Sequence, residues 1–285
     1  MLAVVGTVPD PDAGLIFGEA VLGGDTLVVN GQSLAVNRGT PALLGAAAAM
    51  CGVLTIPPPY AYLAGDIGLG RGSRDLYKFL TENIAAQKIS VLVFHYLQPD
   101  VDWHNKVLFA IEEMEPRPFL IADAGFMYAA KMSGQAPSYD LFTPDAGELA
   151  FLADEKAPHP FYTRGFILHE EGCAPKHINR AYTHDNAAKT MLVKGRVDFV
   201  ADANGIFASI DEPDEEALEA IGGTGDTLTG IVSALIHWGM GVREAAAKAA
   251  KINRLAGRYA RPQPDTQVVE IIDCIPKAAK EVLDL

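Results

Sequence analysis

The 285-residue chain is poor in positive charge. It has 23 Lys and Arg against 36 Asp and Glu, which gives a formal net charge of −13 at pH 7. A nucleic-acid partner would need clustered Lys and Arg on one face, so the acidic balance argues against one. It does not exclude a phosphate ligand, because a few backbone amides and a bound cation can create a local field of the opposite sign.

Cysteine is also scarce, and no basic segment opens the sequence. The three cysteines, Cys51, Cys173 and Cys274, lie far apart and form no CxxC pair. This pattern predicts a reducing compartment and no disulfide framework. The first basic side chain is Arg38, so we expect no secretory signal and a cytoplasmic protein.

Charge is absent altogether from residue 39 to residue 65, a stretch long enough to suggest a membrane span. Its residues are mostly small, and the prolines at 57–59 end any helix that reaches them. Leu and Ile drive membrane insertion, whereas Ala and Gly contribute little. A buried, alanine-rich helix followed by a short strand is therefore the preferred interpretation, with a membrane span as the alternative.

Apolar, β-rich runs alternate with helical patterns along the chain. Predicted strands cover 26–30, 53–56, 60–64, 90–96, 118–122, 141–143, 190–194, 198–201 and 206–209. Predicted helices cover 41–51, 73–86, 101–113, 147–153, 225–238, 241–259 and 268–282. This alternation indicates βαβ units, and hence a mostly parallel sheet covered by helices. We expect one α/β domain over residues 1–285, with its ligand beyond the carboxyl ends of the strands.

Two glycine-rich segments precede predicted helices. The segment 65–72 (GDIGLGRG) leads into a helix for which Ser73 is the expected N-cap. It matches neither GxGxxG nor a P-loop, because no GK[ST] follows. The second segment, 222–226 (GGTGD), opens an apolar helix. A glycine-rich turn that enters a helix N-terminus is a favourable shape for binding an anion.

The GGTGD run combines an anion cradle with a carboxylate. Gly222, Gly223, Thr224 and Gly225 would present backbone amides to a phosphate, and the helix dipole adds roughly half a positive charge there. A carboxylate would repel a phosphate that is merely bound, but Asp226 makes sense if it takes a proton from an attacking hydroxyl group. The alternative is a first-turn aspartate that the dipole stabilises, and the run alone leaves both interpretations open.

Together with GGTGD, other segments resemble the ribokinase superfamily, specifically the carbohydrate-kinase-like group that includes ATP- or ADP-dependent NAD(P)H-hydrate dehydratases. In chain order, they are 37–52 (a Gly-Ala helix), 122–130 (an aspartate between strand and helix), 141–152 (a TPxxGE motif), 191–209 (strand, KG and hairpin), 222–260 (the GTGD helix and the next) and 271–283 (the last helix). The resemblance covers about residues 27–285 and is strongest in the C-terminal half.

The resemblance implies a ribokinase-like three-layer α/β/α fold and a role for each matching residue. Asp226 would be the catalytic base, and the amides of 223–225 would hold the transferring phosphoryl group. Lys194 would neutralise a nucleotide phosphate, and the helix that contains Asn253 would line the adenine side. For Lys194 the alternative is a solvated lysine at a strand end, but Gly195 follows it and frees the backbone to turn, which favours the functional interpretation.

Three further carboxylates and one glycine receive implied roles. Glu148 would act in the outer shell of Mg²⁺, a cation that takes few protein carboxylates and keeps its waters. An ordinary first-turn carboxylate is an equally open interpretation of Glu148. The resemblance places Asp123, Asp145 and Gly39 on the substrate side.

Two departures from the family pattern concern the substrate rather than phosphoryl transfer. The dehydratases usually have TPHPGE, whereas this chain has TPDAGE, so Asp145 replaces a histidine and reverses the hydrogen-bonding sense. Their GPGLG loop, one strand before the aspartate strand, is replaced by 94–100 (FHYLQPD). Recognition of a hydrate therefore stays open.

Other groups of histidine and acidic residues are weaker candidates. A zinc site is conceivable at His169, Glu170, Glu171, Cys173 and His177. Their spacing is not HExxH, however, and Gly172 and Pro175 indicate a loop. His95 and His104 flank a loop over the candidate site, and we expect them to be hydrogen-bonded surface or interface histidines rather than catalysts.

The resemblance implies an ATP-dependent NAD(P)H-hydrate dehydratase-like enzyme, with ATP (or ADP) and Mg²⁺ as cofactors. It would phosphorylate a hydrate hydroxyl group and then eliminate phosphate. The alternative is a kinase for a sugar or vitamin-precursor hydroxymethyl group, which would use the same Asp226. A third class of function is a nucleotide sensor without turnover. The intact Asp226 argues against this class. We expect a small-molecule substrate and a nucleotide as partners, no nucleic acid and no membrane; a homo-oligomer stays open.

Overall fold

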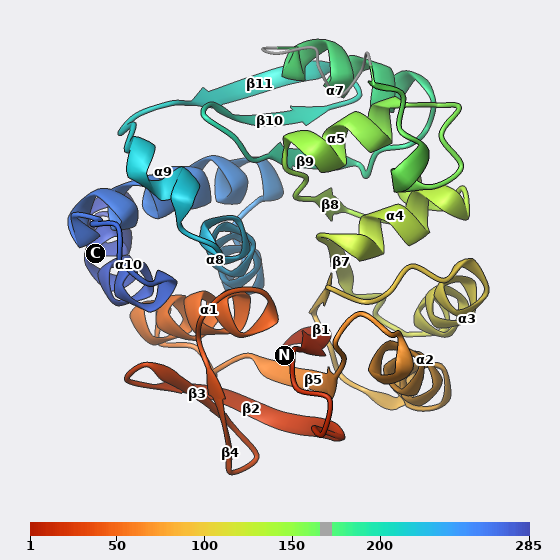
Figure 1. Cartoon of the computed structure of the whole chain (residues 1–285), viewed down its shortest axis with the longest axis horizontal. Helices are drawn as coiled ribbons and strands as arrows, with labels where there is room; N and C mark the ends of the chain where they lie inside the picture. Colours follow the sequence, from red (N-terminus) through yellow and green to blue (C-terminus); the bar gives the residue numbers. More distant parts are fainter. Residues whose placement is uncertain (166–172) are drawn as a thin grey trace.

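The computed structural model describes residues 1–165 and 173–285, and a mixed sheet runs through the middle of the molecule (Figure 1). The described residues form a sheet of eleven strands, in the order β11-β10-β9-β8-β7-β6-β1-β5-β2-β3-β4. The central six are parallel: β1 (Leu2–Val8), β5 (Tyr60–Gly65), β6 (Val91–His95), β7 (Phe119–Ala122), β8 (Leu141–Phe142) and β9 (Thr190–Val193). Antiparallel strands complete both edges: β10 (Asp198–Asp202) and β11 (Gly205–Ile210) at one, β2 (Leu15–Gly23), β3 (Thr26–Val29) and β4 (Gln32–Ala35) at the other.

Helices cover both faces of this sheet. One layer contains α1 (Thr40–Leu54), α8 (Thr224–Trp238), α9 (Val242–Ala260) and α10 (Val268–Leu283). The other contains α2 (Arg71–Asn83), α3 (Val101–Glu112), α4 (Gly125–Met132), α5 (Ala146–Ala153) and α7 (Ala174–Thr183). Short 3₁₀ turns lie at Ile84–Ala86, Ala136–Ser138, Pro160–Tyr162 and Glu216–Ala220. The predicted three-layer α/β/α fold with a mostly parallel central sheet is confirmed.

Strand β1 shows how the sequence produces two cores. Successive side chains of a strand point to opposite faces. Leu2 and Val4 therefore pack under the α1–α8 layer, and Ala3 and Val5 pack under the α2–α3 layer. Both faces of the strand are buried, so β1 consists almost entirely of apolar residues instead of an alternating pattern.

The uncharged stretch near the N-terminus forms a helix buried against other helices. Helix α1 packs on α8 and α10, and a β-carbon added to Gly230 of α8 would lie 2.2 Å from the carbonyl oxygen of Leu43. Small residues thus allow the two helix backbones to approach closely. In the described part of the chain, no helix is long and apolar enough to cross a bilayer.

Several predicted elements were wrong or missing. The predicted strand at 53–56 is the last turn of α1, which ends where Thr55 takes a left-handed φ of 55°. Strands β1, β2 and β4 were not predicted, because no helix separates β1 from β2 and β4 is short and exposed. Helix α7 occupies the region assigned to a loop, since Pro175 stands in its first turn, where proline is tolerated.

Candidate active site

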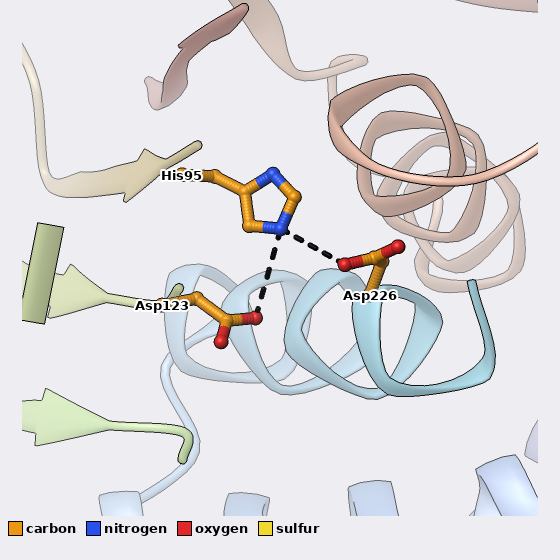
Figure 2. Close-up of side chains that lie close together, drawn as sticks. All are labelled: His95, Asp123 and Asp226. Carbon is orange, nitrogen blue, oxygen red and sulfur yellow. Dashed lines mark hydrogen bonds and ion pairs between the residues drawn. The ribbon is translucent and has the colours of Figure 1, made fainter. Parts of the chain in front are cut away.

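The carboxylate of Asp226 lies in the first turn of α8, facing the end of β6 and the start of α1. The Gly39 amide donates to its Oδ2 over 2.6 Å, and the His95 Nε2 lies 2.9 Å from its Oδ1 (Figure 2). Only 12% of the Asp226 side chain is exposed. Gly39, implied as a substrate residue, therefore also holds the proposed base through its backbone.

The surroundings of Asp226 favour its ionised form. Burial by itself raises the pKa of this carboxyl, but the His95 hydrogen bond and charge, Lys194 and the Gly39 amide together bring the pKa below its ordinary value. A carboxylate that is ionised at neutral pH and points into a cavity can act as a general base.

The start of α8 has the features of an anion-binding site. Gly223 takes the N-cap position with a φ of 102°, and no side chain of the described residues caps this end. A β-carbon on Gly223 would lie 3.0 Å from Val268, so the position is crowded as well as left-handed. The amides of Thr224 and Gly225 are thus left for a ligand, with the positive end of the helix dipole behind them.

The other glycine-rich segment contrasts with this one. Helix α2 begins at Arg71, after Gly70, so Ser73 is not its N-cap as predicted. Instead, the carboxylate of Asp66 accepts from the amides of Gly68, Leu69, Gly70 and Ser73 and from the Ser73 hydroxyl, each at 3.0 Å. The anion position at α2 is therefore occupied by the protein's own side chain.

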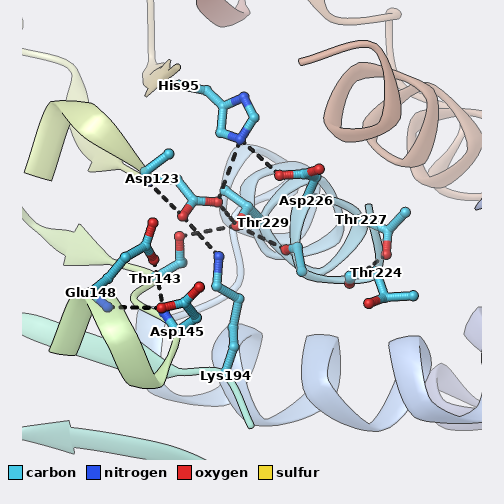
Figure 3. Close-up of polar contacts among 12 residues, drawn as sticks. His95, Asp123, Thr143, Asp145, Glu148, Lys194, Thr224, Asp226, Thr227 and Thr229 are labelled. Carbon is cyan, nitrogen blue, oxygen red and sulfur yellow. Dashed lines mark hydrogen bonds and ion pairs between the residues drawn. The ribbon is translucent and has the colours of Figure 1, made fainter. Parts of the chain in front are cut away.

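Lys194, directly after β9, pairs with a buried aspartate. Its Nζ lies 2.8 Å from Oδ1 of Asp123, and the Thr229 hydroxyl donates to Oδ2 of Asp123 over 2.6 Å (Figure 3). Asp123 is 1% exposed and Lys194 11% exposed, so Lys194 is not a solvated strand-end lysine. Burial lowers the pKa of Lys194, but Asp123 and Glu148 raise it well above its usual value, which keeps the ammonium charged.

Asp145 and Glu148 form a reciprocal cap at the start of α5. The Glu148 amide donates to Asp145 Oδ1, and the Asp145 amide donates to Glu148 Oε2, both over 2.8 Å (Figure 3). Burial raises the pKa of Glu148 to about 8, although the charge of Lys194 opposes this rise. Asp145, which replaces the expected histidine, thus has a local structural role in addition to facing the site.

These residues share one cavity of about 580 Å³. It is lined from one side by Tyr96, Asp123, Asp145 and Glu148, and from the other by 223–226 and Asn253. The amide of Asn253 donates to the Thr224 carbonyl over 3.0 Å and accepts from the Thr227 hydroxyl over 2.7 Å. Asn253 therefore braces the first turn of α8 at the cavity wall. Gly222, the first residue of the GGTGD run, is exposed beside Arg38.

Two residues with strained backbones line this cavity. Tyr96 and Ala124 have φ values of 48° and 51°, and Gly39 beside them has a φ of 69°. Non-glycine residues rarely take left-handed φ values, and such strain is frequent at functional sites. Five other non-glycine residues in the described part of the chain also have positive φ, at turns and helix ends, so the strain accompanies the side-chain geometry of the site and does not define it alone.

Possible metal ligands also meet here. Ligand atoms of His95, Asp123 and Asp226 lie within 4.8 Å of one another. His95 already contacts Asp226, and Asp123 already has the ammonium of Lys194. Because these contacts satisfy the three groups, we assign no metal to them.

The segment of the chain that carries this site matches a known protein family. A family model described as NAD(P)H-hydrate dehydratase matches residues 95–277, more than half of the chain. The chain belongs to the NAD(P)H-hydrate dehydratase family. An uncharacterized protein of Methanocaldococcus jannaschii is 44% identical over 77% of this chain and 90% of its own length.

Relatives that are named for an enzymatic activity match shorter parts of the chain. An ADP-dependent (S)-NAD(P)H-hydrate dehydratase of Cenarchaeum symbiosum is 28% identical over 61% of this chain and 55% of its own. A bifunctional NAD(P)H-hydrate repair enzyme of Pyrobaculum aerophilum is 29% identical over 49% of this chain. The match spans only 25% of that longer protein.

Solved structures support the fold. A ribokinase-like superfamily protein of Enterococcus faecalis superposes with a TM-score of 0.61 at 14% identity, over 99% of this chain and 87% of its own. A hydroxyethylthiazole kinase of Pyrococcus horikoshii gives 0.58 at 17% identity, over 99% and 90%. The ribokinase-like fold implied by the sequence is confirmed, and the chain is a member of an enzyme family.

In this member of the NAD(P)H-hydrate dehydratase family, the positions of two histidines differ from those expected from the sequence. His95 ends β6 and is fully buried against Asp226, so it is not a surface or interface residue. His104 is buried in α3, where it contacts the Tyr139 hydroxyl over 2.8 Å and burial lowers its pKa to about 4. The position of His95 at the end of an apolar strand could have pointed to the carboxyl edge of the sheet, where sites form.

Two other residues of the site region gave no sequence signal. Thr229 lies mid-helix, and Arg254 lies on α9 with its guanidinium contacting Asp198 and the carbonyls of Gly195 and Arg196. Arg254 thus fixes the turn that follows Lys194. Of the residues considered for a zinc site, His169, Glu170 and Glu171 lie outside the described residues. Cys173 is the N-cap of α7, and His177 lies within that helix.

Proposed function

We propose that the protein is a nucleotide-dependent NAD(P)H-hydrate dehydratase that uses ATP or ADP. The observation that carries this proposal is the ionised, buried Asp226 beside the uncapped N-terminus of α8, in a chain of this family. Asp226 takes the proton of the hydrate hydroxyl group as that oxygen attacks the terminal phosphoryl group. The α8 amides stabilise the charge on the transferring group.

The second half of the reaction needs no further nucleophile. The ring nitrogen's lone pair can expel phosphate, but it expels hydroxide poorly, so the nucleotide serves to make a leaving group. Loss of a ring proton, to the departing phosphate or to water, then restores the reduced nicotinamide. The protein positions the ring and excludes water within the cavity described above.

Glu148 fits a role near a divalent cation. Its carboxyl is costly to ionise where it lies, as the raised pKa shows, and a nearby cation would offset that cost. Mg²⁺ would supply charge neutralisation on the nucleotide phosphates. Lys194 and Asn253 line the same cavity and are proposed to face the nucleotide.

The test is a hydrate assay. Hydrated NADH with ATP or ADP and Mg²⁺ should recover absorbance in the reduced-nicotinamide band, with phosphate released in equal amount. Asp226→Asn serves as the matched control for spontaneous recovery. A stable phosphorylated product, or phosphorylation of a hydroxymethyl compound without hydrate repair, would instead establish the kinase alternative, which Asp145 and the missing GPGLG loop favour.

We further propose that residues 1–285 form one catalytic domain that acts in the cytoplasm, on a small molecule and a nucleotide.

A further inference from the structure

His95 connects the proposed catalytic base to a hydroxyl group at the start of α1. The side chain is 0% exposed at the carboxyl end of β6. Its Nε2 lies 2.9 Å from Asp226 Oδ1 (Figure 2). Its Nδ1 lies 3.0 Å from the Thr40 hydroxyl oxygen. Both ring nitrogens are therefore engaged, one of them by the proposed catalytic base.

The chemistry of Asp226 fixes the direction of one of these hydrogen bonds. An ionised carboxylate only accepts, so Nε2 must carry a hydrogen and donate it to Asp226. Nδ1 accepts from the Thr40 hydroxyl when the ring is neutral and donates to the Thr40 oxygen when the ring is charged. In both forms, a chain of hydrogen bonds connects Thr40 through His95 to Asp226.

The fold holds this chain in place from three elements. A β-carbon on Gly6 of β1 would lie 2.5 Å from the Thr40 hydroxyl oxygen and 2.6 Å from the His95 carbonyl oxygen. Only glycine leaves room there, so β1, β6 and the start of α1 close around the imidazole. The ring of Tyr96 packs edge-on against it, with centroids 4.3 Å apart.

Asp226 has one donor for each carboxylate oxygen. Gly39 donates to Oδ2 from the N-cap position of α1, and His95 donates to Oδ1 from β6. Two donors from different elements leave the carboxylate one orientation, with a remaining lone pair free for a substrate proton. The donor from β6 lies within residues 94–100, the segment in which this chain departs from GPGLG, so the sequence motifs do not account for it.

We propose that His95 is a positioning residue that orients Asp226 and keeps it ionised for proton abstraction. This inference rests on the proposed role of Asp226 as the base. Other charged or titratable groups that face the pair are Asp123 on the loop after β7, Lys194 after β9, Glu148 on α5 and Tyr96. All of them remain in the variants below, so changes can be assigned to the imidazole.

The kinetic test compares His95→Leu with His95→Gln. Leucine removes both polar contacts, whereas the glutamine amide can still donate to Asp226. We expect His95→Leu to lower kcat about tenfold or more, with less than about a twofold change in the nucleotide KM, because a charge-assisted donor to the base is lost. Loss of that donor raises the pKa of Asp226, so the acidic limb of the kcat profile should move to higher pH. His95→Gln should recover most of the rate and the original limb.

A second measurement does not need turnover. In protein labelled with ¹³C at aspartate carboxyls, the Asp226 signal, assigned by its loss in Asp226→Asn, should titrate at higher pH in His95→Leu than in wild type or His95→Gln. The titration separates this inference from the proposed function, since it is readable even if no hydrate is repaired. Identical titration in all three proteins, or equal kcat profiles in folded variants, would overturn the inference.

Discussion

Two aspartates beside two helix N-termini show how one residue type serves opposite purposes. Asp66 turns toward α2 and accepts from the Ser73 amide of its first turn and from amides of the loop before it, so a carboxylate already fills the anion position there. Asp226 belongs to α8 but turns away from its N-terminus, toward Gly39 and His95. In the proposed mechanism, the α8 amides therefore stay available to a phosphoryl group while the carboxylate faces the attacking hydroxyl.

Asp226→Asn should lower kcat more than about a hundredfold, while nucleotide still binds. The amide keeps the size of the side chain but cannot take up a proton. Single-turnover kinetics and nucleotide titration by calorimetry measure the two effects. A kcat near that of wild type would remove Asp226 from the mechanism. Asp66 does not line the cavity, so Asp66→Asn is the control and should turn over normally.

Glu148→Gln should raise the Mg²⁺ concentration needed for half-maximal rate about tenfold or more. Glutamine can preserve the capping box with Asp145, so the thermal melting curve should not change. Glu270→Gln is the matched control, because Glu270 closes the equivalent box at the start of α10 and does not line the cavity. Overlapping magnesium titrations for wild type and Glu148→Gln would contradict the assignment.

At the scale of elements, the contact between α1 and α8 sets the position of the base. The two helices carry Gly39 and Asp226 at their facing N-termini, and Gly230 allows their backbones to approach. Any outward shift of α8 would lengthen the hydrogen bond from Gly39. Helix packing and catalytic geometry are therefore coupled.

Gly230→Ala should destabilise the protein by about 1–3 kcal/mol, because its methyl group overlaps the Leu43 carbonyl, and should also lower kcat. Gly52→Ala is the matched control on the exposed side of α1, where a β-carbon meets no atom within 4 Å. That change should stabilise by up to about 1 kcal/mol, since alanine favours helix more than glycine does. Urea denaturation measures both, and equal effects of the two alanines would refute the packing argument.

The cap at α2 predicts a pH dependence of stability. Hydrogen bonds outweigh the effect of burial and hold the pKa of Asp66 below its ordinary value of 3.8. A depressed pKa stabilises the folded state above that ordinary value, and the effect is lost as the pH falls through the lowered pKa. Asp66→Asn should therefore cost about 0.3–1 kcal/mol at pH 7 and progressively less in acid. Denaturation midpoints over a pH series check this, and a deficit independent of pH would contradict it.

At the scale of the whole molecule, one sheet connects both cores, and the cavity lies where its carboxyl ends meet both helix layers. The net charge of the chain is −13. The cavity lining is acidic as well, with nine carboxylates against Lys194, Arg196 and Arg254. In the proposed function, Lys194 and the α8 amides would supply the local positive field that a phosphate group requires.

Thermal unfolding should occur as one cooperative transition, because the shared sheet leaves neither half with a complete core. Nucleotide with Mg²⁺ should shift Tm upward, as any ligand that binds only the folded state does. Differential scanning calorimetry measures both. Two separate transitions, of which only one responds to nucleotide, would indicate more than one domain.

Local sequence patterns determined many of the secondary-structure elements of this protein. The GGTGD run, the strand before Lys194 and helices α8, α9 and α10 were predictable because apolar periodicity, glycine and capping residues act over a few neighbours. The N-terminal strands were harder, since β1 and β2 lack the intervening helix that signals a βαβ unit. The cap of α2 was misassigned to Ser73 because the true acceptor, Asp66, precedes the helix by several residues.

Only the tertiary structure decided what surrounds Asp226. Gly39 is 187 residues away in sequence and His95 is 131 away, yet both donate to the same carboxylate. Neither residue could be assigned this role from the sequence, because a backbone amide has no sequence signature and a single histidine can serve many functions. Parallel strand ends and helix N-termini converge at one edge of the sheet, and that convergence, rather than any motif, assembled the base with its two donors.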